Sequence, residues 1–384
     1  MNSSLRELSD IEYGASPKEI RADDKTSIGI YGTGGFLGHA TKSLFNGPLV
    51  VVARKGTLDN PIYVRGDCWV IDTAFAVLPK SDVEAKWLYY QLSNYDLKKL
   101  NESTGVPSIN REYLYRLSFN NPGSAQQRKI ARILSATDEV IGQTEEAIEK
   151  LRKIKQGMRR DLFTRGIDVK TGKLRPEHAE RPDLYKASEI GFIPKEWGEV
   201  ELQELLSITT GDKDTQDSQK DGLYPFFVRS QVIERINSFS FDGEAILTAG
   251  DGVGTGKIYH YINGKFDFHQ RVYMLHNFSS EVTGKYIFYY FKDHFMKRVE
   301  MFSAKNTVDS VRRHMISEMK VPKPSKDEQN VIVDRLSAVD SRISYEDAFL
   351  AKILELKQGL MQDILTGRVP VVPDPQDKEY QGAN

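Results

Sequence analysis

The sequence predicts an α+β fold built from two copies of one unit, each a β-rich mixed α/β domain followed by one long helix. Two observations support this prediction. First, residues 127–166 align on residues 329–368 without a gap at a constant offset of 202, and 13 of these 40 positions are identical. Second, a heptad pattern of apolar residues runs through both aligned segments, whereas short β-forming runs fill the regions before them.

The composition bounds the class of protein. The chain has 384 residues, of which 39% are hydrophobic and 28% charged, as in soluble globular proteins of two or more domains. Its longest apolar run, residues 47–53, is too short to cross a bilayer, and no secretory leader is evident. Cys68 is the single cysteine, so neither an intrachain disulfide nor a cysteine zinc cluster can form. We expect a cytoplasmic protein.

The order of elements follows from the runs between turn residues. β-forming runs stand at 27–32, 49–56, 61–64 and 68–77 in the first half, and at 224–230, 245–250, 257–262 and 271–275 in the second. Each half then has an aromatic helical stretch, which is more typical of a core than of a base-stacking surface. The predicted parts are a domain at 1–122, a helix at 123–166, a loop-like linker at 167–198, a domain at 199–324, a helix at 325–368 and a mobile tail at 369–384.

The two long helices are predicted from a seam that steps by four and three residues. Ser124 with Gln127, and Ser325 with Glu328, have the spacing of a helix-starting capping box. We expect the seam to pair the helices or bind a partner through Ile130, Leu134, Ile141, Ile148, Leu151, Met158 and Leu162 in the first helix, and Ile332, Leu336, Ile343, Leu350, Ile353, Leu360 and Ile364 in the second. Gly157 and Gly359 recur inside a duplicated "KQG", which suggests a close backbone approach there or a tolerated ancestral glycine.

Two segments resemble nucleotide-binding loops but lack residues that such loops require. In residues 251–257, Asp251 replaces the first glycine of a phosphate-binding loop, and Ile258 stands where a serine or threonine would bind magnesium. In residues 32–38, Leu37 replaces the third glycine of a dinucleotide-binding motif. The histidines lack ligand spacing and no nucleophile–base set is recognisable, so we expect no catalytic residue and no metal site.

The ordered set of motifs resembles the specificity (S) subunit of type I restriction-modification systems. Two variable regions are each closed by a long helix that bears "KQG" and ends in "DLFTRG" or "DILTGR". Four further segments are similar to that family: "ARKGT" (53–57), "DTAF" (72–75), "STGVPSINREYL" (103–114) and "GFIPKEW" (191–197). The resemblance covers roughly residues 1–368, and the chain departs from it in a short N-terminus before "LRELSDIEYG".

The resemblance implies a non-catalytic recognition subunit for double-stranded DNA. Each β-rich domain would be a target recognition domain that reads one half of a split, asymmetric site. The helices would form an antiparallel coiled coil with pseudo-two-fold symmetry, set the gap between the half-sites and dock two methyltransferase (M) subunits. We expect no cofactor in this chain, because the M subunits would bring S-adenosylmethionine, and motor-nuclease (R) subunits would bring ATP and magnesium.

Residue chemistry selects candidates for DNA contact, since phosphates attract basic, hydroxyl and backbone N–H groups while bases are read by forked or amide side chains. The candidates are Arg54, Lys55, Gly56, Thr57, Ser103, Thr104 and Arg111 in the first half, and Arg229, Ser230, Gln231, Thr255, Lys257, Gln270, Arg271, Lys305, Asn306, Arg312 and Arg313 in the second. Each is as compatible with a solvated surface as with DNA. Residues 150–166 hold seven basic residues and one acidic residue, which suit DNA, an acidic partner or solvent.

Two other functions stay open from the sequence. The chain could be a self-contained DNA-modifying enzyme with an unrecognised site, which a methyl-transfer assay on the purified chain would reveal. It could instead be a coiled-coil adaptor with β-rich protein-binding domains. Specific DNA protection that disappears when the domains are deleted would exclude that second alternative.

Overall fold

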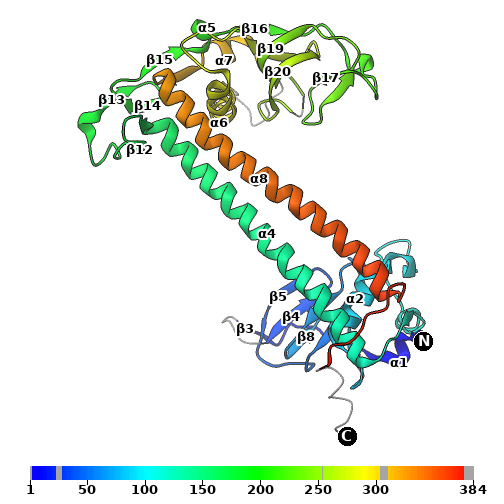
Figure 1. Cartoon of the computed structure of the whole chain (residues 1–384). Coiled ribbons are helices and arrows are strands. Elements are labelled where there is room, and N and C mark those ends of the chain that lie inside the picture. The colour runs from blue at the N-terminus through cyan, green and yellow to red at the C-terminus, as the bar shows by residue number, and fades with distance from the viewer. Residues whose placement is uncertain (1, 23–27, 253, 303–309, 376–384) are drawn as a thin grey trace. The chain divides into compact units, whose positions relative to one another are not determined.

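The computed structural model describes residues 2–22, 28–252, 254–302 and 310–375, and the chain divides into two compact units (Figure 1). The first unit comprises Met1–Ala147 and Glu346–Asn384, and the second comprises Ile148–Tyr345. Two long helices, α4 (Ser124–Thr164) and α8 (Lys326–Leu360), each contribute one part to each unit. A π-helical turn, η4 (Met361–Leu365), follows α8.

The first unit contains two four-stranded sheets and a two-stranded one. The sheet β2-β9-β6-β7 is antiparallel, and the sheet β3-β5-β4-β8 has one parallel pair, β4 with β8. The strands are β1 (Asn2–Ser4), β2 (Ser9–Tyr13), β3 (Arg21–Ala22), β4 (Gly29–Gly32), β5 (Gly35–Ala40), β6 (Leu49–Ala53), β7 (Ile62–Val64), β8 (Cys68–Val70), β9 (Ala74–Pro79) and β10 (Ser118–Asn120), the last paired with β1. Strand β6 is buried along its whole length, which explains why its sequence is continuously apolar.

Short helices and the first part of α4 cover the β2-β9-β6 sheet. The helices are α1 (Leu5–Leu8), α2 (Ala85–Asn94), the 3-10 turn η1 (Leu97–Leu100) and α3 (Arg111–Tyr115). One core joins Val50, Val52 and Phe75 of this sheet to Trp87 of α2 and Leu134 of α4. Ile364 and Leu365, which follow α8, belong to the same core. The aromatic stretch of α2 is therefore core, as its sequence predicted.

The second unit contains a six-stranded sheet in the order β16-β21-β19-β20-β17-β18. Its strands are β16 (Ser207–Thr210), β17 (Tyr224–Phe227), β18 (Glu234–Ile236), β19 (Phe241–Ala249), β20 (Tyr259–Phe268) and β21 (Val272–His276), and a separate pair joins β15 (Gly198–Glu201) to β22 (Lys320–Lys323). The helices are α5 (Leu202–Leu205), the 3-10 turn η3 (Thr215–Asp217), α6 (Gly284–Phe302) and α7 (Arg313–Ser317). Tyr286 and Phe291 of α6 share a core with Leu162 of α4 and Leu336 of α8.

The two units share a scaffold and differ in what is added to it. The strand order β2-β9-β6 in the first unit corresponds to β16-β21-β19 in the second, and β1-β10 corresponds to β15-β22. The match continues to the next strand, because β7 pairs antiparallel with β6 as β20 does with β19. Beyond these strands the first unit adds a separate four-stranded sheet, whereas the second extends its sheet with β17 and β18. The predicted fold class is therefore confirmed, including its internal repeat.

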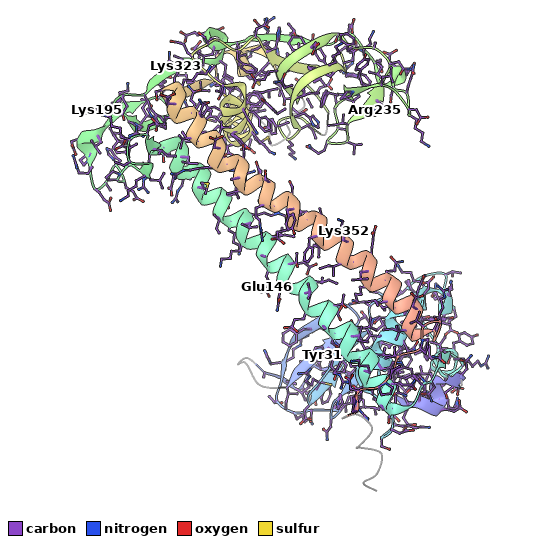
Figure 2. All side chains as sticks on the ribbon, viewed as in Figure 1. Tyr31, Glu146, Lys195, Arg235, Lys323 and Lys352 are labelled. Atoms are coloured by element: carbon purple, nitrogen blue, oxygen red, sulfur yellow. The ribbon has the colours of Figure 1, made fainter. Side chains whose placement is uncertain are left out.

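Within each unit α4 and α8 run antiparallel. In the first unit, Asp138 of α4 pairs with Lys357 of α8, while the earlier Ile130 shares a core with the later Leu365. In the second unit, Lys155 of α4 pairs with Asp340 of α8, and Leu162 shares a core with Ile332. Side chains project outward along both helices, as Glu146 on α4 and Lys352 on α8 illustrate (Figure 2).

The linker is more structured than its polar sequence predicted. It contains the hairpins β11 (Ile167–Asp168) with β12 (Lys173–Leu174), and β13 (Tyr185–Ser188) with β14 (Gly191–Pro194), together with the 3-10 turn η2 (Pro182–Leu184). Glu328, at the start of α8, is 2% exposed and accepts hydrogen bonds from Arg175, from Trp197 and from the backbone N–H of Ile167. These bonds to a buried carboxylate fix the linker on the helix.

The tail predicted as mobile also begins with an ordered stretch. Asp374 pairs with Lys129 at 2.8 Å and with Arg132 at 2.7 Å, and Gln126 donates to the carbonyl of Val371. Residues 376–384 of the predicted tail lie outside the described residues. Along the described chain, none of the helices is long and apolar enough to span a bilayer.

Candidate nucleic-acid interface

The candidate residues of the first domain gather where strand β6 ends. The backbone N–H groups of Arg54 and Lys55 donate to the carbonyl of Thr73 at 2.9 and 3.0 Å. Lys55 also forms an isolated β-bridge with Ser108, and Ile109 donates to the carbonyl of Arg54. The "ARKGT" and "STGVPSINREYL" segments, distant in sequence, are therefore brought together at one sheet edge.

The second domain has the same backbone arrangement at the end of β19. Gly250 donates to the carbonyl of Arg271 at 2.8 Å, Asp251 forms an isolated β-bridge with Ser310, and Val311 donates to Gly250. Because Ser310 lies 202 residues after Ser108, the two bridges identify Lys55 and Asp251 as equivalent backbone positions.

The glycine that follows each of these residues supports the equivalence. Gly56 and Gly252 both have a positive φ, 97° and 80°. Residues with a side chain rarely adopt this backbone conformation, so both turns need glycine. The sequence match between the two domains is too weak here to reveal this correspondence.

In the first domain, two arginines of this edge lie against one aromatic ring. The guanidinium groups of Arg54 and Arg111 lie 5.2 and 5.0 Å from the ring centroid of Tyr13, which is 47% exposed. Arg54 also donates to the carbonyl of Asp72 at 3.1 Å, and Lys55 beside it is exposed. The result is a positively charged surface whose arginines are oriented by cation–π contacts.

In the second domain, two arginines lie against one carboxylate. Nη1 of Arg229 and Nη1 of Arg271 contact the two oxygens of Asp251 at 2.8 and 2.5 Å. Burial raises the pKa of the Asp251 carboxyl, but the hydrogen bonds from both arginines outweigh burial and bring this pKa below its ordinary value. The hydrogen bond to Asp251 also raises the pKa of Arg271. The carboxylate is therefore ionised and shared between the two guanidinium groups.

The backbone of Arg271 is fixed on both sides. Its N–H donates to Nδ1 of His269 at 2.9 Å, and its carbonyl accepts from Gly250. His269 is 2% exposed, and burial lowers its pKa, which favours the neutral ring whose Nδ1 can accept this bond. The neighbouring Gln270 donates to Asp214 at 3.0 Å.

The other candidate residues vary in accessibility. Thr57, Thr104, Gln231, Lys257, Arg312 and Arg313 are exposed, and Ser103 and Ser230 are half-buried in local turns. Thr255 is 3% exposed and its hydroxyl donates to the carbonyl of Gly252, so it closes a loop and offers no free surface. Lys305 and Asn306 lie outside the described residues.

Sequence reasoning missed Asp251, Tyr13 and the two bridging serines. In the sequence Asp251 only marks a departure from a phosphate-binding loop, because its partners Arg229 and Arg271 lie 22 residues before it and 20 after it. The usable signal was the offset of 202, which already aligned Ser108 with Ser310. Among the residues that the structure describes, no group of acidic, histidine or cysteine side chains is placed to hold a metal ion.

A second set of polar side chains joins the helices to each domain. In the first unit, Tyr90 of α2 donates to Asp138 of α4 at 2.6 Å, and Lys357 of α8 contacts the other oxygen at 2.5 Å. In the second unit, Tyr289 of α6 donates to Asp340 at 2.9 Å, and Lys155 pairs with the same carboxylate.

These two triads are equivalent by sequence as well as by contact. Asp138 and Asp340 are separated by the offset of 202, as are Lys155 and Lys357. Each duplicated "KQG" lysine therefore binds the duplicated aspartate of the opposite helix. Burial, with the hydrogen bond to Asp340, raises the pKa of Tyr289 to about 12, and burial raises that of Tyr90 further, so both phenols stay protonated and donate.

A duplicated glutamine anchors the start of each long helix. Gln127, 2% exposed, accepts from the backbone N–H of Glu84 at 2.8 Å and donates to the carbonyl of Pro122. Gln329, fully buried, accepts from Thr283 at 2.9 Å and donates to Pro324 in the same way. Two hydrogen bonds from a buried amide fix where each domain meets its helix.

The predicted seam is buried at some positions and half-buried at others. Ile130, Leu134, Ile148, Leu162, Ile332, Leu336, Ile353 and Ile364 are buried, whereas Ile141, Leu151, Met158, Ile343, Leu350 and Leu360 are half-buried. A Cβ atom added at Gly157 or Gly359 would meet no described atom within 4 Å. The predicted close backbone approach at these glycines is therefore not made within the described chain.

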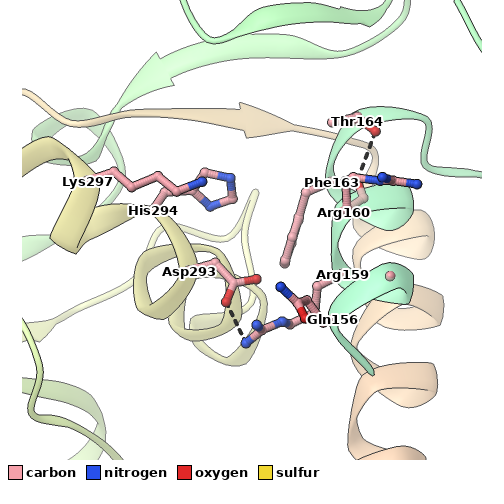
Figure 3. A pocket seen from close by; sticks show the side chains of 9 residues that line it. Gln156, Arg159, Arg160, Phe163, Thr164, Asp293, His294 and Lys297 are labelled. Atoms are coloured by element: carbon pink, nitrogen blue, oxygen red, sulfur yellow. Dashed lines mark hydrogen bonds and ion pairs between the residues drawn. The ribbon is translucent and has the colours of Figure 1, made fainter. Parts of the chain in front are cut away.

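The second unit also has a pocket of about 540 Å³ between α4 and α6 (Figure 3). Arg159 and Asp293 pair across it at 2.5 Å, and the ring of Phe163 projects towards His294. Lys155 and Arg159 both belong to the basic stretch at 150–166, and both bind acidic residues of this unit. Much of that stretch is thus engaged in internal ion pairs.

Comparison with known proteins matches this architecture to one family. The model of the type I restriction modification DNA specificity domain matches residues 1–153 and 194–355, one copy in each half. The chain is 26% identical over 311 residues to the type I restriction enzyme MjaVIII specificity subunit of Methanocaldococcus jannaschii, covering 74% of this chain and 70% of that protein. It is 30% identical over 176 residues to the EcoDI specificity subunit of Escherichia coli, covering 46% of this chain and 38% of that protein.

Solved structures show the same fold. A type I restriction-modification S subunit from M. genitalium superposes with a TM-score of 0.70 over 95% of this chain and 96% of that one, at 15% identity. A chain from a structure of type I restriction-modification complex assembly and conformational transition gives a TM-score of 0.52 over 96% of this chain and 98% of that one, at 14% identity. With two matched specificity domains and this shared fold, the chain belongs to the specificity (S) subunits of type I restriction-modification systems.

Proposed function

We propose that the two β-rich domains each read one half of a split, asymmetric DNA site, while the paired helices set the gap and dock two M subunits. One observation carries this proposal: the domains place different side chains at one equivalent sheet edge, Lys55 in the first and Asp251 in the second. The triads that bind each domain to the helices are identical in type. Two different half-sites require different reading surfaces, and two copies of one partner require similar docking surfaces.

The charge of the domains fits a subunit that works within a complex. Residues 1–122 contain 14 basic and 14 acidic residues, and residues 199–324 contain 16 and 17. Nonspecific DNA affinity comes mainly from neutralising phosphates, so near-neutral domains hold DNA weakly by themselves. The M subunits would supply much of the contact to the DNA phosphates. They would also bring the S-adenosylmethionine that is used for methylation. R subunits would add ATP, magnesium and cleavage, and the whole complex would act on DNA in the cytoplasm.

The long helices offer surfaces for the M subunits. Large apolar side chains stay exposed along them, namely Val140 and Ile154 on α4 and Tyr345, Phe349, Leu354 and Leu356 on α8. Exposed apolar groups of this size are typical of protein-binding surfaces when they gather on one element. The internal repeat supports two similar docking surfaces, and mass measurement of the assembled complex tests the ratio of two M subunits to one chain.

The proposal is tested by exchanging residues 199–324 for the matching region of another S subunit and mapping methylated sites of the complex. We expect one half of the methylated sequence to change and the other half to stay the same, because each domain reads its half independently. Exchanging residues 1–122 is the matched control and should change the opposite half. If either exchange altered both halves together, independent reading would be contradicted.

The same experiment separates the S-subunit function from the two alternatives. Methyl transfer by the purified chain, without an M subunit, would support a self-contained enzyme. Assembly with M subunits that produced no sequence-specific methylation would support a protein-binding adaptor. Sequence-specific methylation that requires both chains is the expected result.

A further inference from the structure

Arg271 of the second domain is an exposed arginine that is held at both its backbone and its side chain. The Arg271 side chain is 60% exposed, yet its backbone N–H, its carbonyl and its Nη1 are all held, by His269, Gly250 and Asp251. Holding an exposed side chain in one conformation lowers the entropy that it loses on binding a ligand. Such an arrangement favours a recognition role over a random surface charge.

We propose that Arg229, Asp251 and Arg271 form a guanine-reading site in the half-site of the second domain, with Asp251 as the positioning residue. This inference rests on the proposed function and identifies a base within it. In both arginines one Nη is bound to Asp251, and within the described residues Nε and Nη2 of each have no partner. These two nitrogens form one edge of the guanidinium with parallel N–H donors.

The geometry of that free edge fits guanine. In the major groove guanine presents two adjacent acceptors, O6 and N7, and a bidentate arginine is the commonest contact to them. Adenine presents a donor in place of one acceptor, so the same fork binds it less well. Each oxygen of Asp251 already accepts from one arginine, so the carboxylate is directed at the two guanidinium groups, whose free edges are the donors presented to a base.

The carboxylate also distinguishes a base from a phosphate. Asp251 is ionised and lies against both guanidinium groups, so a phosphate approaching them would meet a like charge as well as two opposite ones. A guanine edge is neutral and avoids that repulsion. At the equivalent position the first domain has Lys55, which adds a positive charge beside Arg54 and Arg111. That edge is better suited to phosphate contact. The same backbone position would therefore serve phosphate contact in the first domain and base reading in the second.

The test is the Asp251→Asn variant in the complex with its M subunits, with methylated sites mapped base by base. We expect the preference for guanine at one position of the second half-site to fall roughly 10- to 100-fold, the range of one bidentate base contact. The first half-site should keep its sequence. Arg271→Lys, which keeps the charge and loses the fork, should relax the same position.

The matched control is Lys55→Gln at the equivalent position of the first domain. It should weaken DNA binding about equally for all sequences and reduce the salt dependence of affinity, as loss of a phosphate contact does. If Asp251→Asn instead behaved in that uniform way, or left every preference unchanged, the guanine-reading site would be refuted. An unchanged first half-site and an unchanged melting temperature show that the Asp251→Asn chain is folded.

The domain exchange separates this inference from the proposed function. If exchanging residues 199–324 changes one half-site while Asp251→Asn changes nothing, the inference alone fails. If the exchange also has no effect on either half-site, both the inference and the proposed function are overturned.

Discussion

The helix contacts and the sheet edges of the two units have diverged to very different degrees. Each helix contact uses a tyrosine, an aspartate and the "KQG" lysine of the opposite helix, with the same roles in both units. The two sheet edges have the same backbone hydrogen bonds, but Lys55 of the first domain is replaced by Asp251 in the second. The two arginines lie against a tyrosine ring in the first domain and against a carboxylate in the second. Backbone bonds thus preserve the position of the site while side chains change its chemistry.

This difference shows why the duplicated string is the one in the helices. Each "KQG" lysine on one long helix pairs with an aspartate on the other. A change at either position therefore leaves its partner's charge unpaired. The side chains of the sheet edges have no such dependence between the two copies of the repeat, because each edge pairs residues of its own copy. Each can change its side chains without affecting the other.

The largest expected effect comes from lengthening the two long helices, α4 and α8, while leaving both sheet edges intact. Because Asp138 faces Lys357, Thr144 lies opposite about Ala351 within the first unit. Seven residues inserted after each would extend both helices by about 10.5 Å and return each to within about 20° of its original face. This is near three base pairs at roughly 3.4 Å each.

We expect the lengthened complex to methylate sites with the same two half-sequences and a gap longer by about three base pairs. Activity should fall, because DNA turns by about 100° over that distance and the second domain would meet its half-site misoriented. Methylation mapping measures both effects. Full activity at the original gap would show that something other than α4 and α8 sets the distance.

A smaller effect is expected from breaking one triad at a time. Asp340→Ala leaves Lys155 and Tyr289 without their shared acceptor, and Asp138→Ala does the same to Lys357 and Tyr90. Both aspartates are about one-third exposed, so each loss should lower the free energy of unfolding by about 1 kcal/mol. Urea unfolding of the purified chain measures this change.

The charge exchange Lys155→Asp with Asp340→Lys is the matched control for the triads. It keeps opposite charges on opposite helices and should recover part of the lost stability, whereas Lys155→Asp alone should not. Equal losses in the single and the exchanged variants would mean that the pairs are not coupled. Equal losses of unfolding free energy in the two units would show that the two triads are equivalent in energy as well as in contacts.

The sequence predicted the repeated parts of the fold better than the unique ones. Repetition placed the first helix at 123–166 and the second at 325–368, close to α4 and to α8 with η4. The heptad seam is a local signal, so it could be found without a structure. The predicted capping boxes were right only in part: the hydroxyl of Ser325 accepts from the backbone N–H of Glu328, but the side chains of Gln127 and Glu328 bond other segments. The sequence predicts a loop for the linker because its strands are two to four residues long, too short to show an alternating pattern.

The candidate site was predicted only in part, for a related reason. Arginines in loops could be selected by type, but the acidic and aromatic residues that orient them lie on other strands. Tyr13 is about 40 residues from Arg54 and about 100 from Arg111 in sequence. The sequence alone could not show which charges meet, because that depends on strand order. Thr255 illustrates the opposite error, since a residue of suitable type is buried and already bonded.

The smallest expected effect concerns Gly157 and Gly359, which the helix comparison leaves without a role inside the chain. A Cβ at either position would meet no described atom within 4 Å, and glycine costs a helix interior about 1 kcal/mol relative to alanine. Replacing each by alanine should therefore raise the stability of the isolated chain by up to about 1 kcal/mol.

If an M subunit approaches the backbone there, leucine at both positions should weaken assembly while the chain becomes more stable. Gly142 on α4, also open and not duplicated, is the control: Gly142→Leu should leave assembly unchanged. Melting temperatures with the mass of the M-subunit complex measure both quantities. Full assembly of the Gly157→Leu, Gly359→Leu double variant would show that these glycines have no docking role.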